Sequence, residues 1–467
     1  MNELLLEKMR RGEALTRKDQ LIMVILLSIP AILAQVSSII MEYIDASMVG
    51  RLGAGASAAV GLVSSTTWLT SGLCNAIGVG FTVQVAYRIG GSRPDKARET
   101  VKYGLITSLV LSLCVMTVVL AVHRQLPGWL GGAKAIQKDA SSYFMIYGIT
   151  LPFLGIIYTA GGMLQCSGDM RTPSVLNVLM CILDVIFNFF LIFPGRTTTF
   201  AGRNVYIPGA GLKVTGAAIG TSLASICCAL LMLGSLLIKS KDLHLRKGEG
   251  WVFPLNDIIR DLRVSLPVMA SSVIMGAAYV AGTYIVAPLG TIAIAANSFA
   301  VTAESICYMP GYGISAAATT IVGQAKGAGR AKLMKRLGWL SIGLGMLAMG
   351  IMAVFLYLAA PGMMHMMTPD PAVRVAGSRV LRLIVYVEPL FGASIVAEGV
   401  YRGLGKTRTP SILILISMWF VRIPLAAFLA GRMGLDGVWL GQGLELCFRG
   451  VIFLLALVWA NRMSGSE

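Results

Sequence analysis

Two polar residues stand four positions apart inside an otherwise apolar stretch. Asp184 and Asn188 are separated by Val, Ile and Phe, and large apolar residues flank them on both sides. A four-residue spacing places both side chains on one face of a helix. A carboxylate and an amide carbonyl on one face supply two hard oxygen ligands for a small cation, or a proton carrier with a hydrogen-bond partner.

Asp45 follows another apolar stretch, residues 31–43, near the outer end of the first predicted span. An ionisable group inside such a stretch costs several kcal/mol unless a partner or a hydrated cavity compensates it. Its carboxylate could bind an ion or a proton, or it could be an interfacial group paired with Arg51. The residue types alone leave both interpretations open.

The second half of the chain holds its own acidic residues in apolar surroundings. Glu304 lies within the segment TAESICYMP, and we predict that it contacts substrate or carries a proton. Glu388 directly precedes Pro389, and we predict a substrate anchor there.

Other charged residues of the second half are spaced as ion pairs. Glu398 lies one helical turn before Arg402, and Glu445 one turn before Arg449, so each couple is predicted to form a structural pair. Arg422 has no evident partner in the sequence.

The composition places these residues in a membrane. The chain has 467 residues, of which 56% are hydrophobic and only 13% charged, and its mean hydropathy is +0.76. Soluble domains carry about 25% charged residues, so most of this surface must face lipid. Soluble enzymes and nucleic-acid-binding proteins are thereby excluded.

Apolar runs divide the chain into a dozen membrane-crossing helices of about 20 residues or more. The predicted spans are 21–47, 54–86, 101–122, 141–164, 173–193, 213–238, 262–286, 291–322, 338–360, 376–401, 410–430 and 436–461. The first run is longer than the apolar core of a signal peptide and lacks a small-residue cleavage site, so we expect it to be retained.

Basic residues are distributed unevenly between the two sides. The termini and the loops on their side hold 26 Lys and Arg, against about 9 in the opposite loops. The positive-inside bias therefore predicts cytoplasmic termini, with a long external loop at 194–212. The net charge of +17 is explained mainly by this topology, and no nucleic-acid partner is expected.

Cysteine and histidine spacing shows no catalytic or metal-binding pattern. The eight cysteines fall in or beside apolar spans without a CxxC motif, and the three histidines lie in loops or at span ends. No disulfide framework, metal centre, cofactor or enzyme activity is predicted. Nothing resembles the carbonyl filter or ring of charges of a passive channel.

The two halves of the chain repeat at an offset of 237 residues. Pro30 corresponds to Pro267, Gly90 to Gly327, and the motif GDMRTP at 168–173 to GKTRTP at 405–410. Later, GAAIG at 216–220 matches GVWLG at 437–441. Each half holds an even number of spans, so the copies are parallel and related by an axis along the membrane normal.

These motifs, together with DASMVGRLGAGASAAVG at 45–61 and MPGYGISAAATTIVGQAKGAG at 309–329, resemble the multidrug and toxic compound extrusion (MATE) transporters. The resemblance spans nearly the whole chain. It implies an all-α polytopic membrane protein in which twelve helices form two parallel, pseudo-symmetric six-helix bundles around a central cleft. The implied domains are 1–238 and 262–467, joined by a cytoplasmic linker at 239–261.

The resemblance also implies a function: proton- or sodium-coupled antiport that exports organic, often cationic and amphiphilic compounds by alternating access. Flippases of lipid-linked oligosaccharides share the fold and remain the alternative. They should line their cavity with several Arg or Lys, whereas this chain has only Arg422 and Arg449 well inside spans. We expect a monomer in the bacterial cytoplasmic membrane.

The family pattern assigns residues to the coupling site. Asp45 matches the first-span aspartate and Thr221 the sixth-span threonine. Family members usually carry an amide at position 184 and Asp or Asn at 188, so here the carboxylate is shifted by one turn. Asn177 is expected to face the same cavity, and sodium, if it is the coupling ion, would bind Asp45, Asp184, Asn188 and Thr221.

The predicted substrate cavity combines acidic and aromatic side chains. Aromatic residues and the 25 methionines suit adaptable apolar contact. The candidates besides Glu304 and Glu388 are Tyr43, Phe153, Tyr308 and Phe391.

Overall fold

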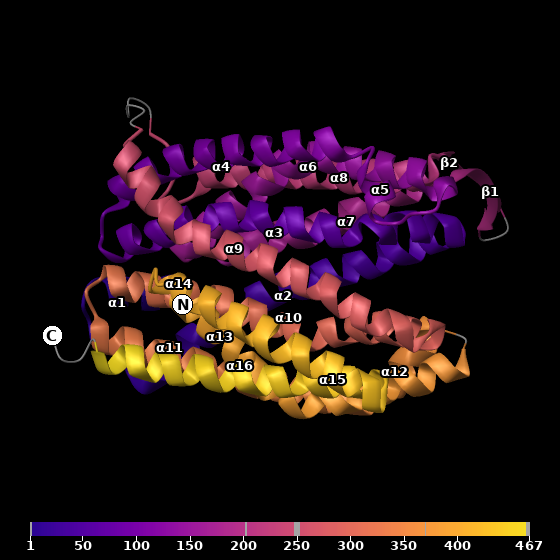
Figure 1. Ribbon diagram of the computed structural model, residues 1–467. Coiled ribbons are helices and arrows are strands. Elements are labelled where there is room, and N and C mark those ends of the chain that lie inside the picture. Colours follow the sequence, from indigo (N-terminus) through magenta and orange to yellow (C-terminus); the bar gives the residue numbers. More distant parts are fainter. Residues whose placement is uncertain (1, 201–202, 247–252, 369, 464–467) are drawn as a thin grey trace.

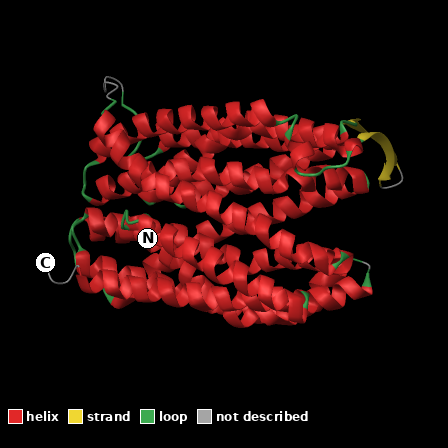
Figure 2. Cartoon of the chain, viewed as in Figure 1, coloured by secondary structure: helices red, strands yellow, loops and turns green. Residues whose placement is uncertain are grey.

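The computed structural model describes residues 2–200, 203–246, 253–368 and 370–463. Over these residues the regular secondary structure is helical except for one two-stranded hairpin at one end (Figure 2). Twelve helical segments of the described chain are long and apolar enough to cross a membrane, as the hydropathy pattern predicts.

The first half contributes six of these spans and two short helices. Their bounds are α1 Asn2–Arg10, α2 Arg17–Gly50, α3 Ala54–Gly90, α4 Pro94–Val122, α5 Leu126–Trp129, α6 Lys134–Ser167, α7 Arg171–Ile192 and α8 Lys213–Gly234, which continues as the π-helix η1 Ser235–Lys239.

The second half contributes the other six, two of them interrupted. Their bounds are α9 Leu255–Val286 with the 3₁₀ turn η2 Ala287–Leu289, α10 Thr291–Gly327, α11 Ala331–Met367, α12 Pro371–Ile384, η3 Val385–Val387, α13 Glu388–Gly403, α14 Arg408–Leu415, η4 Ile416–Arg422, α15 Ile423–Met433 and α16 Leu435–Met463.

Most helices extend beyond the predicted spans. For example, α9 begins at Leu255, inside the predicted linker 239–261, and α3 continues to Gly90 rather than ending at 86. Hydropathy marks the part of a helix that lies in hydrocarbon, whereas the backbone hydrogen bonds continue into the headgroup region.

The breaks in the tenth and eleventh spans occur beside prolines. Pro389 lies at the start of α13 after the 3₁₀ turn η3, and Pro424 follows the π-helix η4. Proline has no N–H to donate, so the regular hydrogen-bond ladder is interrupted there. Arg422 is therefore the last residue of an irregular segment, and Glu388 directly follows one.

The segment 194–212, predicted only as a long loop, contains a β-hairpin. Strands β1 Pro194–Phe200 and β2 Arg203–Ala210 are antiparallel, with Thr198 opposite Val205. The β-branched residues of this segment favour strands, a signal that a search for apolar helices does not detect. The hairpin projects from the end of the molecule opposite α1 (Figure 1).

Equivalent positions of the repeat have the same conformation and contacts. Gly53 and Gly290 both have positive φ, 109° and 98°, at the turn between the first two spans of each half, which favours glycine. The Ser174 hydroxyl donates to the Pro30 carbonyl at 2.6 Å, and 237 residues later Ser411 donates to the Pro267 carbonyl at 2.7 Å.

The halves meet at a glycine crossing between α3 and α10, which we call the glycine seam. A Cβ added to Gly90 would overlap the backbone of Gln324, and one added to Gly327 would overlap the backbone of Tyr87. Tyr87 and Gln324 are themselves 237 residues apart, so the contact is reciprocal, as across a two-fold axis.

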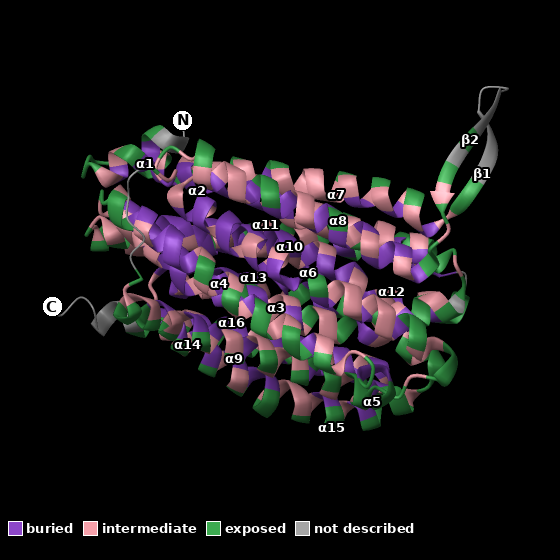
Figure 3. Cartoon of the chain, turned by 90° about the horizontal axis from the view of Figure 1, so that it is seen from above, coloured by how far each residue is buried: buried purple, intermediate pink, exposed green. Residues whose placement is uncertain are grey.

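Helix α1 packs beside this seam. Leu6 and Met9 are buried in a cluster that contains residues of both halves, including Met170 and Ile321. Arg10 donates to the Ser167 carbonyl at 2.7 Å and to Gln324 Oε1 at 3.2 Å, and thereby connects α6 with α10. Figure 3 shows buried residues in the interior and gathered toward this end.

The first span of each half packs against both halves. Helix α2 packs against α10 as well as α7, and α9 packs against α3 as well as α14. Neither half therefore buries its apolar faces without the other.

We predict that Gly90→Ala destabilises the protein by about 1–3 kcal/mol, because the added methyl group forces the two backbones apart. Gly343→Ala is the control: no atom lies within contact distance of its added Cβ, and the change removes a flexible helical residue, worth up to about 1 kcal/mol of stabilisation. Thermal unfolding in detergent measures both. Equal melting temperatures for the two variants would contradict the close packing of α3 against α10 at the glycine seam.

Candidate coupling and substrate site

Asn188 joins the two aspartates of the first half. Its Nδ2 donates to Asp45 Oδ1 at 2.8 Å and to Asp184 Oδ2 at 3.2 Å. Asp45 comes from α2, and the other two residues lie one turn apart on α7. The predicted helical face of Asp184 and Asn188 is confirmed, and it points toward α2.

Two oxygen atoms of this cluster are buried without a hydrogen-bond partner among the described residues: Asp184 Oδ1 and Asn188 Oδ1. Both residues are 0% exposed. The Thr221 hydroxyl and the Asp45 carboxyl group lie beside Asp184. Gly220 leaves room for the Asn188 carbonyl, since a Cβ there would overlap Oδ1. We name Asp45, Asp184, Asn188 and Thr221 the oxygen cluster.

The oxygen cluster contains two carboxyl groups, and neither has a basic partner among the described residues. In the described chain no ion pair is formed by Asp45 or Asp184, and Arg51 instead lines a cavity of about 270 Å³ with Tyr43 and Phe189. Two carboxylates close together in a poorly hydrated site repel each other strongly. A proton or a sodium ion bound between them relieves this repulsion, and the unpartnered oxygens are suitable ligands for either.

Two further residues concern this site. Glu42 lies one turn before Asp45 on α2, near enough for the two carboxyl groups to interact electrostatically. Sequence analysis missed Glu42, although an acidic residue within a membrane span is itself an indication of function. Asn177 makes no hydrogen bond in the described structure to the cluster, and its place in the cavity stays a prediction.

A second polar group lies in the other half. Gln442 Nε2 donates to both carboxylate oxygens of Glu304, at 3.1 and 3.2 Å, while Gln442 Oε1 accepts from Arg422 Nη2 at 2.6 Å. Arg422 also stacks over the ring of Tyr279. Sequence analysis missed Gln442; it is a polar residue inside the last span, one turn before Glu445.

Glu388 lies in the same region and is unpaired. It is 0% exposed, and neither carboxylate oxygen has a hydrogen-bond partner within the described residues. Cys307 lies beside it, and Glu304 is near enough to interact electrostatically. Glu304 and Glu388 thus form an acidic site of their own, built from α10 and α13.

The aromatic candidates separate into different regions. Tyr308 and Phe391 pack edge to face with ring centroids 5.7 Å apart, one turn after Glu304 and Glu388 respectively. Tyr43 contacts Met367 of α11, with Oη 3.8 Å from Sδ. Phe153 packs instead against a hydrophobic cluster of the first half, so the structure does not bring it to Tyr308.

The predicted structural ion pairs are confirmed. Arg449 Nη2 lies 2.6 Å from Glu445 Oε1, and Arg402 pairs with Glu398. Both pairs join neighbouring turns of one helix, as their spacing predicted.

Comparison with known proteins identifies the family. The MatE family model matches residues 30–190 and 267–428, one segment in each half. The probable multidrug resistance protein NorM of Thermotoga maritima is 25% identical over 454 residues, which cover 93% of this chain and 92% of that protein.

Solved structures share the fold over nearly the full length. A MATE protein in complex with MaL6 superimposes with a TM-score of 0.87 at 20% identity, covering 98% of this chain and 99% of that one. A multidrug resistance MATE transporter of the MOP superfamily in an outward-facing conformation gives 0.86 at 21% identity, covering 95% and 96%. The chain is a multi-pass membrane transporter, not an enzyme, and it belongs to the MatE family, the MATE transporters that its motifs resemble.

Proposed function

We propose that this protein is a proton- or sodium-coupled antiporter that exports organic, cationic amphiphilic compounds by alternating access. The observation that carries the proposal is the oxygen cluster, in which two carboxylates share one amide and have no basic partner in the described chain. The multidrug resistance name of the NorM relative supports the substrate class.

Coupling follows from charge. Binding of one inward-moving cation between Asp45 and Asp184 compensates one negative charge and relieves the repulsion between the two carboxylates. Each charge that moves inward at 100 mV releases about 2.3 kcal/mol, so one coupled cation supports export against a substantial gradient. Two adjacent carboxylates favour a proton, whereas the unpartnered Asn188 carbonyl and the Thr221 hydroxyl suit sodium, so both ions belong to the proposal.

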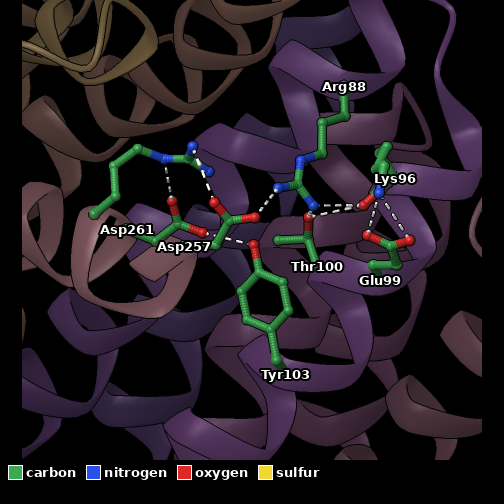
Figure 4. A network of polar contacts seen from close by, with 8 residues as sticks. Arg88, Lys96, Glu99, Thr100, Tyr103, Asp257 and Asp261 are labelled. Atoms are coloured by element: carbon green, nitrogen blue, oxygen red, sulfur yellow. Dashed lines mark hydrogen bonds and ion pairs between the residues drawn. The ribbon is translucent and has the colours of Figure 1, made fainter. Parts of the chain in front are cut away.

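Alternating access requires two bodies that rock, and we assign these to residues 1–238 and 262–467. The glycine seam and α1 hold the terminal end closed, so this end must open for substrate to enter from the cytoplasm. The interface there includes charged contacts between α9 and the first half (Figure 4). Arg88 Nη2 lies 3.1 Å from Asp257 Oδ2, and Tyr103 donates to Asp261 Oδ2 at 2.8 Å.

The second half supplies the substrate site in this proposal. Glu304 and Glu388 offer negative charge beside the aromatic pair Tyr308 and Phe391, a combination that suits an amphiphilic cation. Flipping a pyrophosphate-linked lipid instead needs free basic side chains, whereas Arg422 donates to Gln442 and Arg449 is paired with Glu445. These contacts favour the antiporter over the flippase.

We expect a fluorescent organic cation to be expelled from cells, and transported in reconstituted vesicles, only when a proton or a sodium gradient is imposed. Each gradient is applied alone, with protein-free vesicles as the control. Transport that responds to neither gradient would contradict antiport, and movement of a lipid-linked sugar in the same vesicles would favour the flippase.

We expect Asp45→Asn and Asp184→Asn each to reduce gradient-driven transport to the level of protein-free vesicles. Asparagine preserves volume and hydrogen bonding but cannot take up a proton or neutralise a cation. Asp139→Asn is the matched control, since Asp139 is an exposed acid of the same half. Wild-type coupled transport in a normally expressed variant would exclude that aspartate from coupling.

We propose cytoplasmic termini in a bacterial cytoplasmic membrane. In a cysteine-free background, an impermeant thiol reagent added outside should label Thr198→Cys in the hairpin, but not Lys241→Cys or Lys335→Cys. Permeabilised cells provide the control, because all three sites should then react. The reverse labelling pattern would invert the proposed orientation.

A further inference from the structure

A groove with a volume of about 620 Å³ lies between the last turns of α11 and the first turns of α12. It is bounded by residues 357–365 of α11 and by residues 374–386 of α12 and η3, and we call it the α11–α12 groove. It lies toward the end of the molecule opposite α1 (Figure 1), and all of its lining residues belong to the second half of the chain.

Three arginines of α12, Arg374, Arg379 and Arg382, line the groove. Arg374 Nε donates to the Thr368 carbonyl at 2.7 Å. Arg382 Nε donates to the Tyr357 carbonyl at 3.4 Å, and its guanidinium lies 5.2 Å from the centre of the Tyr357 ring. One nitrogen of each guanidinium is thus anchored to the protein, which orients the remaining N–H groups.

Nearby acidic residues compensate only part of this charge. Asp436 pairs with Arg379 at 3.2 Å. The Asp370 carboxylate accepts the N–H groups of Ala372 and Val373 at the start of α12. Arg374 and Arg382 have no carboxylate partner among the described residues, so the groove keeps an excess of positive charge.

The surface around the groove is apolar and exposed. On α11, Leu358 is 71% exposed and Val354 62%; on α12 and η3, Val375 is 61% and Tyr386 75% exposed. In a membrane protein such side chains face lipid chains. The basic groove therefore opens beside a lipid-facing surface.

The depth of the groove matches lipid headgroups. Helix α11 has 37 residues, a length of about 55 Å at 1.5 Å per residue, against about 30 Å of hydrocarbon. A centred helix therefore extends about 12 Å into each headgroup region. Tyr357 then lies near the boundary, where aromatic residues are enriched, and Arg382 beside it can extend its guanidinium toward the headgroups.

Neither topology nor the repeat accounts for these arginines. They lie at the end where basic residues are scarce. The repeat offset places Gln137, Ser142 and Met145 at the equivalent positions of the first half, so a basic cluster is not needed by the shared scaffold.

We propose that the α11–α12 groove binds the phosphate headgroup of an anionic membrane lipid, with Arg374 and Arg382 as its phosphate ligands. Guanidinium groups donate two parallel hydrogen bonds to phosphate oxygens. The acyl chains lie along the exposed side chains of α11 and α12. The site is independent of the proposed transport function.

The test measures lipid-dependent stabilisation of the full chain in detergent. Phosphatidylglycerol should raise the melting temperature of the wild-type protein, whereas phosphatidylcholine and inorganic phosphate should not. The phosphatidylglycerol shift should be lost in Arg374→Gln/Arg382→Gln and retained in Lys134→Gln/Lys138→Gln, which removes two exposed charges from α6 at the equivalent end of the first half.

A shift that survives in the arginine variant, or that disappears equally in the lysine control, would overturn the proposal. The same shift produced by inorganic phosphate alone would overturn the assignment to a lipid. Should the double variant fail to fold, the single variant Arg382→Gln decides: loss of most of the phosphatidylglycerol shift supports the site, and an unchanged shift contradicts it.

Discussion

Water is absent from the hydrocarbon core of a bilayer, and this constraint divides the ionisable residues of the spans into those with a compensating partner and those without one. A charge inside a span needs a partner, a bound ion or a hydrated path. Arg449 is neutralised by Glu445 one turn earlier, and Arg422 is linked through Gln442 to Glu304. These groups are compensated by their own half of the molecule. Asp45, Asp184 and Glu388 are acidic residues without such compensation among the described residues, and they are the groups on which the proposed transport depends.

The two halves have the same backbone conformation at equivalent positions, but their buried polar residues differ. The turns at Gly53 and Gly290 and the bonds from Ser174 and Ser411 recur at one offset. The oxygen cluster does not recur: Gly282 and Val421 stand where Asp45 and Asp184 would be expected. Common positions maintain the packing that lets two bundles meet, and the positions that differ are free to carry separate tasks. In the proposed function, the first half binds the coupling cation and the second half the substrate.

The two halves approach each other most closely where the contacting residues are glycines. At the glycine seam, α3 and α10 approach so closely that a methyl group would not fit. Such an approach gives close van der Waals packing in a membrane, where apolar side chains gain little by leaving lipid. The seam also holds polar contacts between the halves, since Gln324 donates to the Cys166 carbonyl at 2.7 Å and Lys326 Nζ lies 3.1 Å from Tyr87 Oη, and these contacts must break when the interface opens. Beside the seam, Arg88 and Tyr103 contact Asp257 and Asp261 of α9, and both Tyr103 and Asp261 are buried.

The sequence by itself determined the membrane class, the twelve spans, the repeat and the helical face shared by Asp184 and Asn188. These features depend on local periodicity, on composition and on identical residues at a fixed sequence offset, and all three can be obtained from the sequence without knowledge of tertiary contacts. It also identified the pairs Glu398–Arg402 and Glu445–Arg449, because one helical turn separates their members. Only the tertiary structure decided that Asn188 bridges Asp45, that Gln442 is the partner of Arg422, and that Phe153 lies apart from Tyr308. Those contacts join residues of different helices, and no periodicity specifies which faces of two helices meet. The β-hairpin and the α11–α12 groove were likewise beyond a hydropathy pattern, since cross-strand pairing and the packing of the arginine-bearing helix α12 against α11 depend on how the chain folds back on itself.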